Sequence, residues 1–406
     1  MNDRYDGQAQ VCGVGDERLK QVFRPDSPFA LHDILAVARQ QESDAIAPDP
    51  RFVPAFRELA ESLVEEAALT PVGVTVARRR LALSLANQLR VRRLVESGRV
   101  DPELYGDDAV FVVGLPGTGL RRLQRLLSQH PGLNIPSLWE VARPSTEWAP
   151  WRRDPSLVDP FECALWERPG GAAGRRPDPG APCGDHLLLS YAFHAPSAPV
   201  EYRVPRYADW LDSQDATAAY TFHRRALAVI LERVHGGRPV LVSEFHALRL
   251  DGLLSVYPNA RVIRVHRDPM ASLAGIAELS TQRRRAWSLR VDPRAVKAEW
   301  ARRLGRALAG PQWYDASVGS RVLDIAYAEL AEMPLLTVRR ICEFMDAPLP
   351  SSVEQRMLAE GVRFEEDFPG DFSRDYFGTA DARLPDIFRD HREIYCRHWG
   401  VGMAIQ

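Results

Sequence analysis

The stretch AVFVVGLPGTGLRRLQRLL, residues 109–127, decides the fold that the sequence predicts. Its first five residues form an unbroken apolar run, which is typical of a strand buried on both faces of a parallel sheet. Gly114–Gly119 follows with three glycines and a proline, which form tight turns, and leucines then recur at helical spacing from Leu120. Strand, glycine turn and helix together direct backbone N–H groups toward an anion, although an ordinary turn without a ligand fits equally well.

The same alternation continues along the chain. Apolar runs at Val240–Glu244, Arg261–Arg267 and Arg321–Tyr327 are separated by long helical patterns. Strands that alternate with helices predict an α/β fold with a doubly wound parallel sheet and right-handed crossovers. Ligands in such sheets bind at the carboxyl ends of the strands. We therefore expect the functional residues where these strands end.

The first hundred residues have a different pattern. Helical spacing begins after Ser27-Pro28, returns over Pro54–Leu69 and runs from Pro71 to about Ser97. We expect residues 1–105 to form an all-helical N-terminal extension, with residues 1–25 loosely structured, and residues 106–406 to form the α/β domain. Arg168–Gly184 is rich in proline, glycine and arginine and is predicted to be a flexible loop, either inert or a lid.

Composition excludes several classes of partner. The net charge of −2 favours neither nucleic acid nor an acidic membrane surface. The five cysteines are scattered without a CxxC motif, which predicts free thiols in a reducing compartment and no metal site. No apolar run approaches the length of a membrane span, so a soluble, cytoplasmic protein is expected.

Five acid–base side chains are candidates for a site. Glu244 and His246 follow the run at Val240, Asp185 and His186 open an apolar segment, and Glu140 follows a short predicted strand. Each has a structural alternative. The alternative for His246 is a satisfied core histidine, for Asp185 and His186 a helix cap and its neighbour, and for Glu140 a salt-bridge partner. Glu244 is harder to explain structurally, because a carboxylate after a buried strand needs a partner.

Several long segments, in order and spacing, resemble the bacterial branch of the sulfotransferase family. They are GLPGTGLRRLQRLLSQHPGLNIPSLWE, YRVPRYADWL, LDGLLSVYPNARVIRVHRDP and the YAEL motif with its following helix. The resemblance extends from about Leu69 onward. It implies a P-loop-like α/β sheet and transfer of a sulfuryl group from 3′-phosphoadenosine-5′-phosphosulfate (PAPS) to an alcohol or amine.

The resemblance also implies a donor site. Its 5′-phosphate part is assigned to the turn and first helical residues, and Arg267 matches the arginine that holds the 3′-phosphate. The assigned turn residues are Gly117, Thr118, Gly119, Leu120, Arg121 and Arg122.

The motifs of that donor site are degenerate. The family loop reads Pro-Arg-Ser-Gly-Thr-Thr, and here only the proline, the glycine and Thr118 in place of serine match. The family's strand-end lysine is replaced by Val242, and the serine expected after Arg267 is Gly275. The basic nucleotide loop near the C-terminus is replaced by the acidic FEEDFPGDFSRDYF. Each change weakens recognition of an anionic cofactor.

Three interpretations follow. In the first, the protein is a sulfotransferase of specialised metabolism that acts on a hydroxylated small molecule. His246 is then the general base, Glu244 or Asp185 orients it, and Arg121 or Arg122 replaces the missing lysine charge. In the second, the chain is an accessory subunit in a hetero-oligomer with an active homologue. In the third, the fold performs nucleotide-independent acid–base chemistry led by the five residues above, with Glu140 and His186 contacting the substrate.

Overall fold

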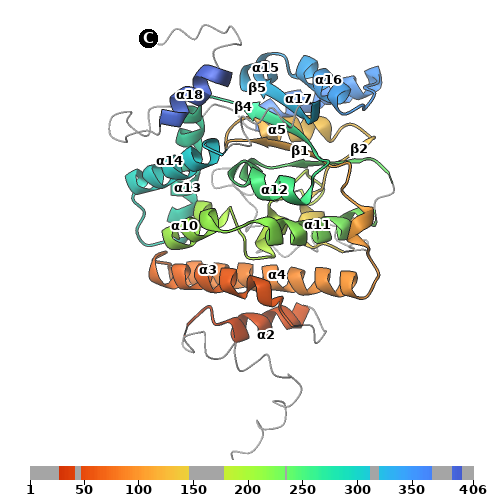
Figure 1. Cartoon of the computed structure of the whole chain (residues 1–406). Helices are drawn as coiled ribbons and strands as arrows, with labels where there is room; N and C mark the ends of the chain where they lie inside the picture. The colour runs from red at the N-terminus through yellow and green to blue at the C-terminus, as the bar shows by residue number, and fades with distance from the viewer. Residues whose placement is uncertain are drawn as a thin grey trace, which may run out of the picture.

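The computed structural model describes residues 27–41, 47–145, 178–233, 236–310, 320–367 and 386–395. At the centre lies a five-stranded sheet in the order β2-β3-β1-β4-β5, in which every pair of neighbours is parallel (Figure 1). The strands are β1 (Val110–Gly114), β2 (Leu133–Asn134), β3 (Arg238–Val242), β4 (Arg261–His266) and β5 (Val322–Ala326). The predicted α/β fold with a doubly wound parallel sheet is confirmed.

Alternation along the central strand divides its side chains between two cores. Val110 and Val112 of β1 point to one face of the sheet, and Phe111 and Val113 point to the other. All four are fully buried, which explains why this strand is apolar without interruption.

One face of the sheet is covered by helices that follow β1 and β5. Figure 1 shows them above the sheet. They are α5 (Leu120–Leu127), α15 (Tyr327–Glu332), α16 (Pro334–Phe344) and α17 (Ser351–Asp367). The leucines of α5 that the sequence placed on one helical face are buried in this core.

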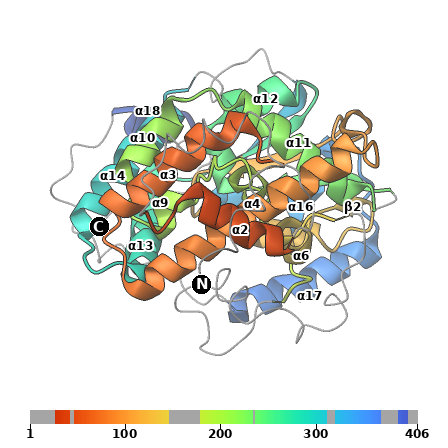
Figure 2. The same cartoon turned by 90° about the horizontal axis from the view of Figure 1, so that it is seen from below.

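The opposite face is covered in two layers. Next to the sheet are α8 (Leu187–Ser190), α11 (Thr217–Leu231) and α12 (Leu250–Val256). Below them lie α2 (Leu31–Gln41), α3 (Val53–Glu65) and α4 (Pro71–Glu96), which Figure 2 shows from their outer side. Residues of these N-terminal helices share one hydrophobic cluster with β1, β3 and β4. The boundary at residue 105 stays a prediction, but the helical extension packs directly into the core of the α/β region.

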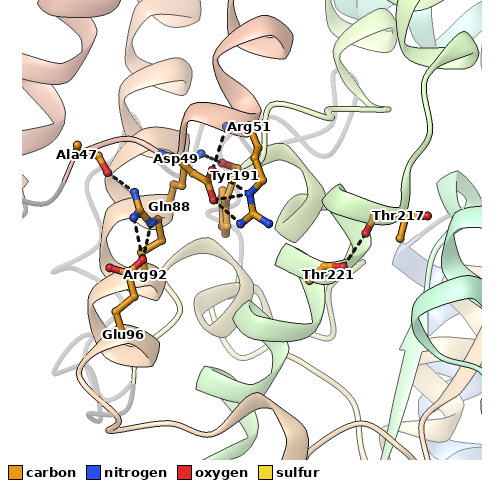
Figure 3. A network of polar contacts seen from close by, with 9 residues as sticks. All are labelled: Ala47, Asp49, Arg51, Gln88, Arg92, Glu96, Tyr191, Thr217 and Thr221. Atoms are coloured by element: carbon orange, nitrogen blue, oxygen red, sulfur yellow. Dashed lines mark hydrogen bonds and ion pairs between the residues drawn. The ribbon is translucent and has the colours of Figure 1, made fainter. Parts of the chain in front are cut away.

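A polar network fixes the N-terminal helices to the layer above (Figure 3). The backbone N–H of Asp49 donates to Gln88 Oε1 at 2.9 Å, and Gln88 Nε2 donates to the carbonyl oxygen of Tyr191 at 2.7 Å. Gln88 is fully buried, so each of these bonds forms away from water. Arg51 pairs with the Asp49 carboxylate at 2.6 Å. Buried polar groups fix one register between helices because any shift leaves them without partners.

A third cluster closes one end of the molecule. It contains α13 (Pro269–Trp287), α14 (Pro293–Leu308) and α18 (Asp386–Tyr395), together with Leu115 and Phe245 from the strand ends. The connections also include α6 (Leu138–Ala142), α9 (Ala198–Glu201), α10 (Pro205–Ser213) and the 3₁₀ turns η1 (Pro50–Phe52), η2 (Pro102–Leu104) and η5 (Glu244–Leu248). No described helix is both long enough and apolar enough to cross a membrane.

Several predicted boundaries differ from the structure. β3 ends at Val242, so Glu244 begins a 3₁₀ turn in place of ending the strand. The helix α13 runs on to Trp287, and its later turns bury against α14. The predicted loop Phe364–Tyr376 begins inside α17, which extends through Asp367. The remainder of that loop, residues 1–25 and residues 168–177 lie outside the described residues.

Candidate functional site

Three features hold the glycine turn after β1 in its conformation. A Cβ at Gly114 would lie 2.4 Å from Thr118 Oγ1 and 2.7 Å from the carbonyl oxygen of Val265, so only glycine fits there. Gly117 and Gly119 have φ values of 83° and 77°, in the left-handed region that favours glycine. The Thr118 hydroxyl donates to the carbonyl oxygen of Leu115 at 2.8 Å, which closes the turn on itself. The hydroxyl proton of Thr118 is therefore already used in a hydrogen bond inside the turn.

The outer side of this turn is open and positively charged. Gly117 and Arg121 are exposed, and a Cβ at Gly117 would meet only Arg267 Nη1 at 3.8 Å. The first-turn N–H groups of α5 have no partner within the helix, so they can receive an anion. Arg267 lies against the same turn: its Nη1 donates to the carbonyl oxygen of Gly117 at 2.6 Å, and its guanidinium covers the Tyr327 ring at 4.1 Å.

The residues after β3 bring a histidine and a carboxylate to the same edge of the sheet. Ser243 caps η5 by accepting the N–H of Phe245 at 3.1 Å, and its hydroxyl oxygen lies 3.1 Å from His186 Nδ1. The His186 ring packs on Phe245 with 4.6 Å between centroids. Both His186 and Glu244 are partly exposed. Burial lowers the pKa of His186, and the charge of Glu244 opposes that shift without reversing it. His186 is therefore neutral at pH 7.

His246 and Asp185 lie deeper, in a fully buried hydrogen-bond network. His246 Nε2 donates to Asp185 Oδ2 at 2.7 Å, and His246 Nδ1 is 2.9 Å from the Tyr220 hydroxyl. His223 repeats the arrangement, with Nε2 2.9 Å from the same Asp185 oxygen and Nδ1 2.8 Å from the Tyr257 hydroxyl. His246, His223 and Asp185 have no exposed surface. The predicted contact between Asp185 and His246 is present, but it orients a histidine whose two ring nitrogens are both committed.

Charge explains why the network is stable. Burial alone would raise the pKa of Asp185, but His246 and His223 hold that pKa well below its usual range. Burial also lowers the pKa of His223 despite its bond to Asp185. The carboxylate is therefore ionised, and its Oδ2 accepts both imidazole N–H groups, while its Oδ1 is buried without a hydrogen-bond partner among the described residues. The sequence made His246 a candidate general base oriented by Glu244 or Asp185, and the structure places its imidazole in the core.

The same three side chains have a spacing that a metal ion could use. Asp185, His223 and His246 each offer one ligand atom, and these atoms lie within 4.8 Å of one another. In the structure both Nε2 atoms hydrogen-bond Asp185 Oδ2, and the hydroxyls of Tyr220 and Tyr257 bond the remaining ring nitrogens. We interpret the cluster as a hydrogen-bond network, since the histidine and tyrosine groups are already satisfied.

Glu140 is occupied by structural contacts. Its carboxylate accepts the N–H of Ser137 at 2.8 Å in a capping box at the start of α6. The same carboxylate pairs with Arg233 at 2.5 Å, and Arg233 lies over the Trp139 ring at 4.1 Å. The salt-bridge alternative weighed for Glu140 from the sequence is therefore the one the structure favours. A substrate contact by Glu140 would compete with both partners.

Sequence reasoning missed Tyr220, His223 and Tyr257. Tyr220 and His223 are three residues apart on α11, so they lie on one face of that helix. That face points to the sheet, where Phe111 lies 5.4 Å from the His246 ring and 4.9 Å from the Tyr257 ring. A tyrosine and a histidine on an otherwise apolar helix face were the available signal, and they predict a buried polar network.

Fold and site together define an α/β protein whose central strand is followed by a glycine turn and a helix N-terminus. The sequence model of the Sulfotransferase family matches residues 109–351, and the chain belongs to that family. The sulfotransferase STF1 from Mycobacterium tuberculosis H37Rv is 26% identical, with 84% of this chain and 98% of that chain covered and a TM-score of 0.69. The sulfotransferase STF9 from Mycobacterium avium is 21% identical, with 90% and 96% covered and a TM-score of 0.76. No curated protein matches the sequence significantly.

Proposed function

We propose that this protein transfers a sulfuryl group from PAPS to a hydroxyl group of a small molecule. The observation that carries the proposal is the open turn at Gly117, where a helix N-terminus, Arg121 and Arg267 meet at the carboxyl end of the sheet. Backbone N–H groups and arginines of this kind suit a phosphate. PAPS, when bound, supplies an activated sulfuryl group on a nucleotide leaving group.

Different residues around the turn contact different parts of the donor in this proposal. Gly117, Gly119 and Leu120 offer backbone donors, and Arg121 adds an exposed positive charge beside them. Arg267 holds the turn through the Gly117 carbonyl and stays within reach of a second phosphate. Val242 occupies the position of the family's lysine and is 3% exposed, so we assign the missing charge to Arg121, which is exposed in the first turn of α5.

We assign the general base to His186. Ser243 Oγ already accepts the Phe245 N–H, and its second lone pair can accept His186 Nδ1–H. Nε2 of His186 then carries the lone pair that removes the acceptor's proton. Glu244 stabilises the imidazolium that results, since its charge raises the pKa of His186. His246 and Asp185 support this edge from below as part of the buried network.

The test is donor binding followed by transfer. Isothermal titration with adenosine 3′,5′-bisphosphate should show 1:1 binding, and Arg121→Ala should weaken it about tenfold, as loss of one charge-assisted contact implies. Arg290→Ala is the matched control, because Arg290 is exposed beyond the far end of α13. Incubation with PAPS and a panel of hydroxylated small molecules, read by mass spectrometry, then detects sulfated product. Absence of nucleotide binding would refute the proposal.

No observation supports the hetero-oligomer of the second interpretation, and it stays a prediction. The specialised-metabolism acceptor and the cytoplasmic location likewise stay predictions. The third interpretation, acid–base chemistry without a nucleotide, gives the open turn at Gly117 no role in binding, so we do not adopt it.

A further inference from the structure

A buried amide lies among the leucines of α5. The buried side chains of this helix are four leucines and Gln124, which is 5% exposed. Gln124 Nε2 donates to the carbonyl oxygen of Cys183 at 2.8 Å, 59 residues away in the chain. A buried amide fixes such a contact, because any shift would leave the amide without its partner. Gln124 therefore joins α5 to the segment that leads to His186.

That segment is held closely against the imidazole. The N–H of Cys183 donates to the carbonyl oxygen of Pro136 at 2.9 Å, so the N–H and the C=O of Cys183 both have partners. Gly184 follows, and a Cβ there would lie 2.8 Å from His186 Nδ1 and 3.4 Å from the carbonyl oxygen of Val242. The backbone of Gly184 therefore lies between the end of β3 and the ring of His186. A shift of the Cys183 carbonyl would move Gly184 and, with it, the imidazole.

Electrostatics gives a second indication that α5 lies close to this segment. Burial raises the pKa of Cys183 to about 12, and the charge of Arg121 opposes that shift, so Arg121 is near the thiol. Arg121 and Gln124 are three positions apart, which places them on one face of the helix. One helix thus carries the proposed donor site at its N-terminus and, one turn later, the contact with the segment of the base.

We propose that Gln124 is a positioning residue, which holds His186 in place relative to the donor through the Cys183 carbonyl and Gly184. This role rests on the proposed function, in which His186 removes the proton of the acceptor hydroxyl. A general base must lie within hydrogen-bond reach of that proton, and a misplacement of about 1 Å can cost about 10²-fold in rate. Loss of the Gln124 contact should therefore slow the reaction and leave binding intact.

Gln124→Met tests this role, because it keeps the length of the side chain and removes its N–H donor. Turnover should fall by about tenfold or more, while the KM of the acceptor and the affinity for adenosine 3′,5′-bisphosphate in isothermal titration change less than about twofold. Gln129→Met is the matched control and should change none of these. Gln129 lies just beyond α5, and its side chain bonds its near neighbours Arg125 and Ser128.

The pKa of His186 supplies a readout that needs no turnover. Burial lowers this pKa, the charges of Glu244 and Asp185 oppose the shift, and that of His246 adds to it. If Gln124→Met loosens the segment, water reaches the ring and the pKa of His186 should rise toward its usual value. An NMR titration of histidine-labelled protein measures the rise, with the His186 signal identified by its loss in His186→Gln.

Gly184→Ala keeps the test decisive if Gln124→Met does not fold. Its added Cβ displaces His186 Nδ1 directly, so turnover should fall while nucleotide affinity stays unchanged. A folded Gln124→Met chain with wild-type turnover and an unchanged His186 pKa would overturn the inference, as would a Gly184→Ala chain with wild-type turnover. If the wild type binds no nucleotide and forms no sulfated product, yet the His186 pKa rises in Gln124→Met, the proposed function fails and the positioning of His186 by Gln124 stands.

Discussion

Arg267 donates from Nη1 to the carbonyl oxygen of Gly117 at 2.6 Å, although 150 residues separate them in the chain. The bond joins the end of β4 to the turn that follows β1, and these strands are neighbours in the sheet. The family resemblance assigns these two residues to opposite phosphates of one nucleotide. Because they are hydrogen-bonded to each other, loss of Arg267 is expected to disturb the turn as well as remove a charge.

Gly114→Ala should destabilise the fold by about 1–3 kcal/mol, the usual cost of overpacking a well-packed core. The added Cβ meets the Thr118 hydroxyl and the backbone of Val265, and a backbone atom cannot move aside alone. Urea unfolding measures the loss. Gly361→Ala is the control. Gly361 lies in α17, and a Cβ added there would have its nearest contact at 3.9 Å, so the free energy of unfolding should rise by about 0.5–1 kcal/mol. Equal effects of the two changes would contradict this account of the turn.

Asp185→Ala should cost about 3–5 kcal/mol, because it removes the charged acceptor shared by two buried imidazole N–H groups. The matched control is Asp209→Ala on α10. Asp209 is half exposed and pairs with Arg302 and Arg306 at the surface, so its loss should cost about 1 kcal/mol or less. Urea unfolding measures the free energy of unfolding of both variants. If Asp185→Ala lowers it no more than Asp209→Ala does, the network does not stabilise the fold.

Stability should fall as the pH is lowered from 7 to 5, in part through His391 on α18. Burial, with the neighbouring charges of His266 and Arg264, lowers the pKa of His391 to about 3. The unfolded chain takes up a proton near pH 6.5 and the folded chain does not, so the stability present above pH 6.5 is lost as the pH drops. One such histidine accounts for about 2 kcal/mol between pH 7 and 5.

His391→Gln should reduce the pH dependence by about that amount in urea unfolding at the two pH values. His32→Gln is the control, because the His32 side chain is 70% exposed. Burial of the imidazole also lowers the pKa values of His223, His266 and the partly exposed His186, so a smaller slope of the same sign remains in the variant. An unchanged slope in His391→Gln would contradict the assignment.

The sequence predicted the sheet well because its signals are local. The apolar strands, the glycine turn and the Asp292 cap before Pro293 at the start of α14 all depend on residues within a few positions of one another. The site was harder to predict because depth in the fold is not a local property. His246 and His186 both lie near strand β3, and only the packing of α11 shows that one is sealed by Tyr220 and the other is partly exposed.

The difference between these two histidines can be measured. His186→Gln should lower turnover by about 10²–10⁴, the usual contribution of a positioned general base. Its cost in stability should be near 1 kcal/mol, because it loses a single hydrogen bond to Ser243. Since the pKa of His186 is lowered, the wild-type rate should be constant across neutral pH and fall only in acid, and this acid limb should vanish in the variant.

His246→Gln should produce the opposite pattern. It breaks contacts with both Tyr220 and Asp185 inside the core, so the midpoint of urea unfolding should drop, while turnover at a temperature where the chain stays folded should change only a few-fold. If His246→Gln instead removes turnover and the acid limb without loss of stability, His246 is the base. The hydrogen bond to Tyr220 must then open during the reaction, because no substrate can reach an imidazole whose two nitrogens are committed and whose surface is fully covered.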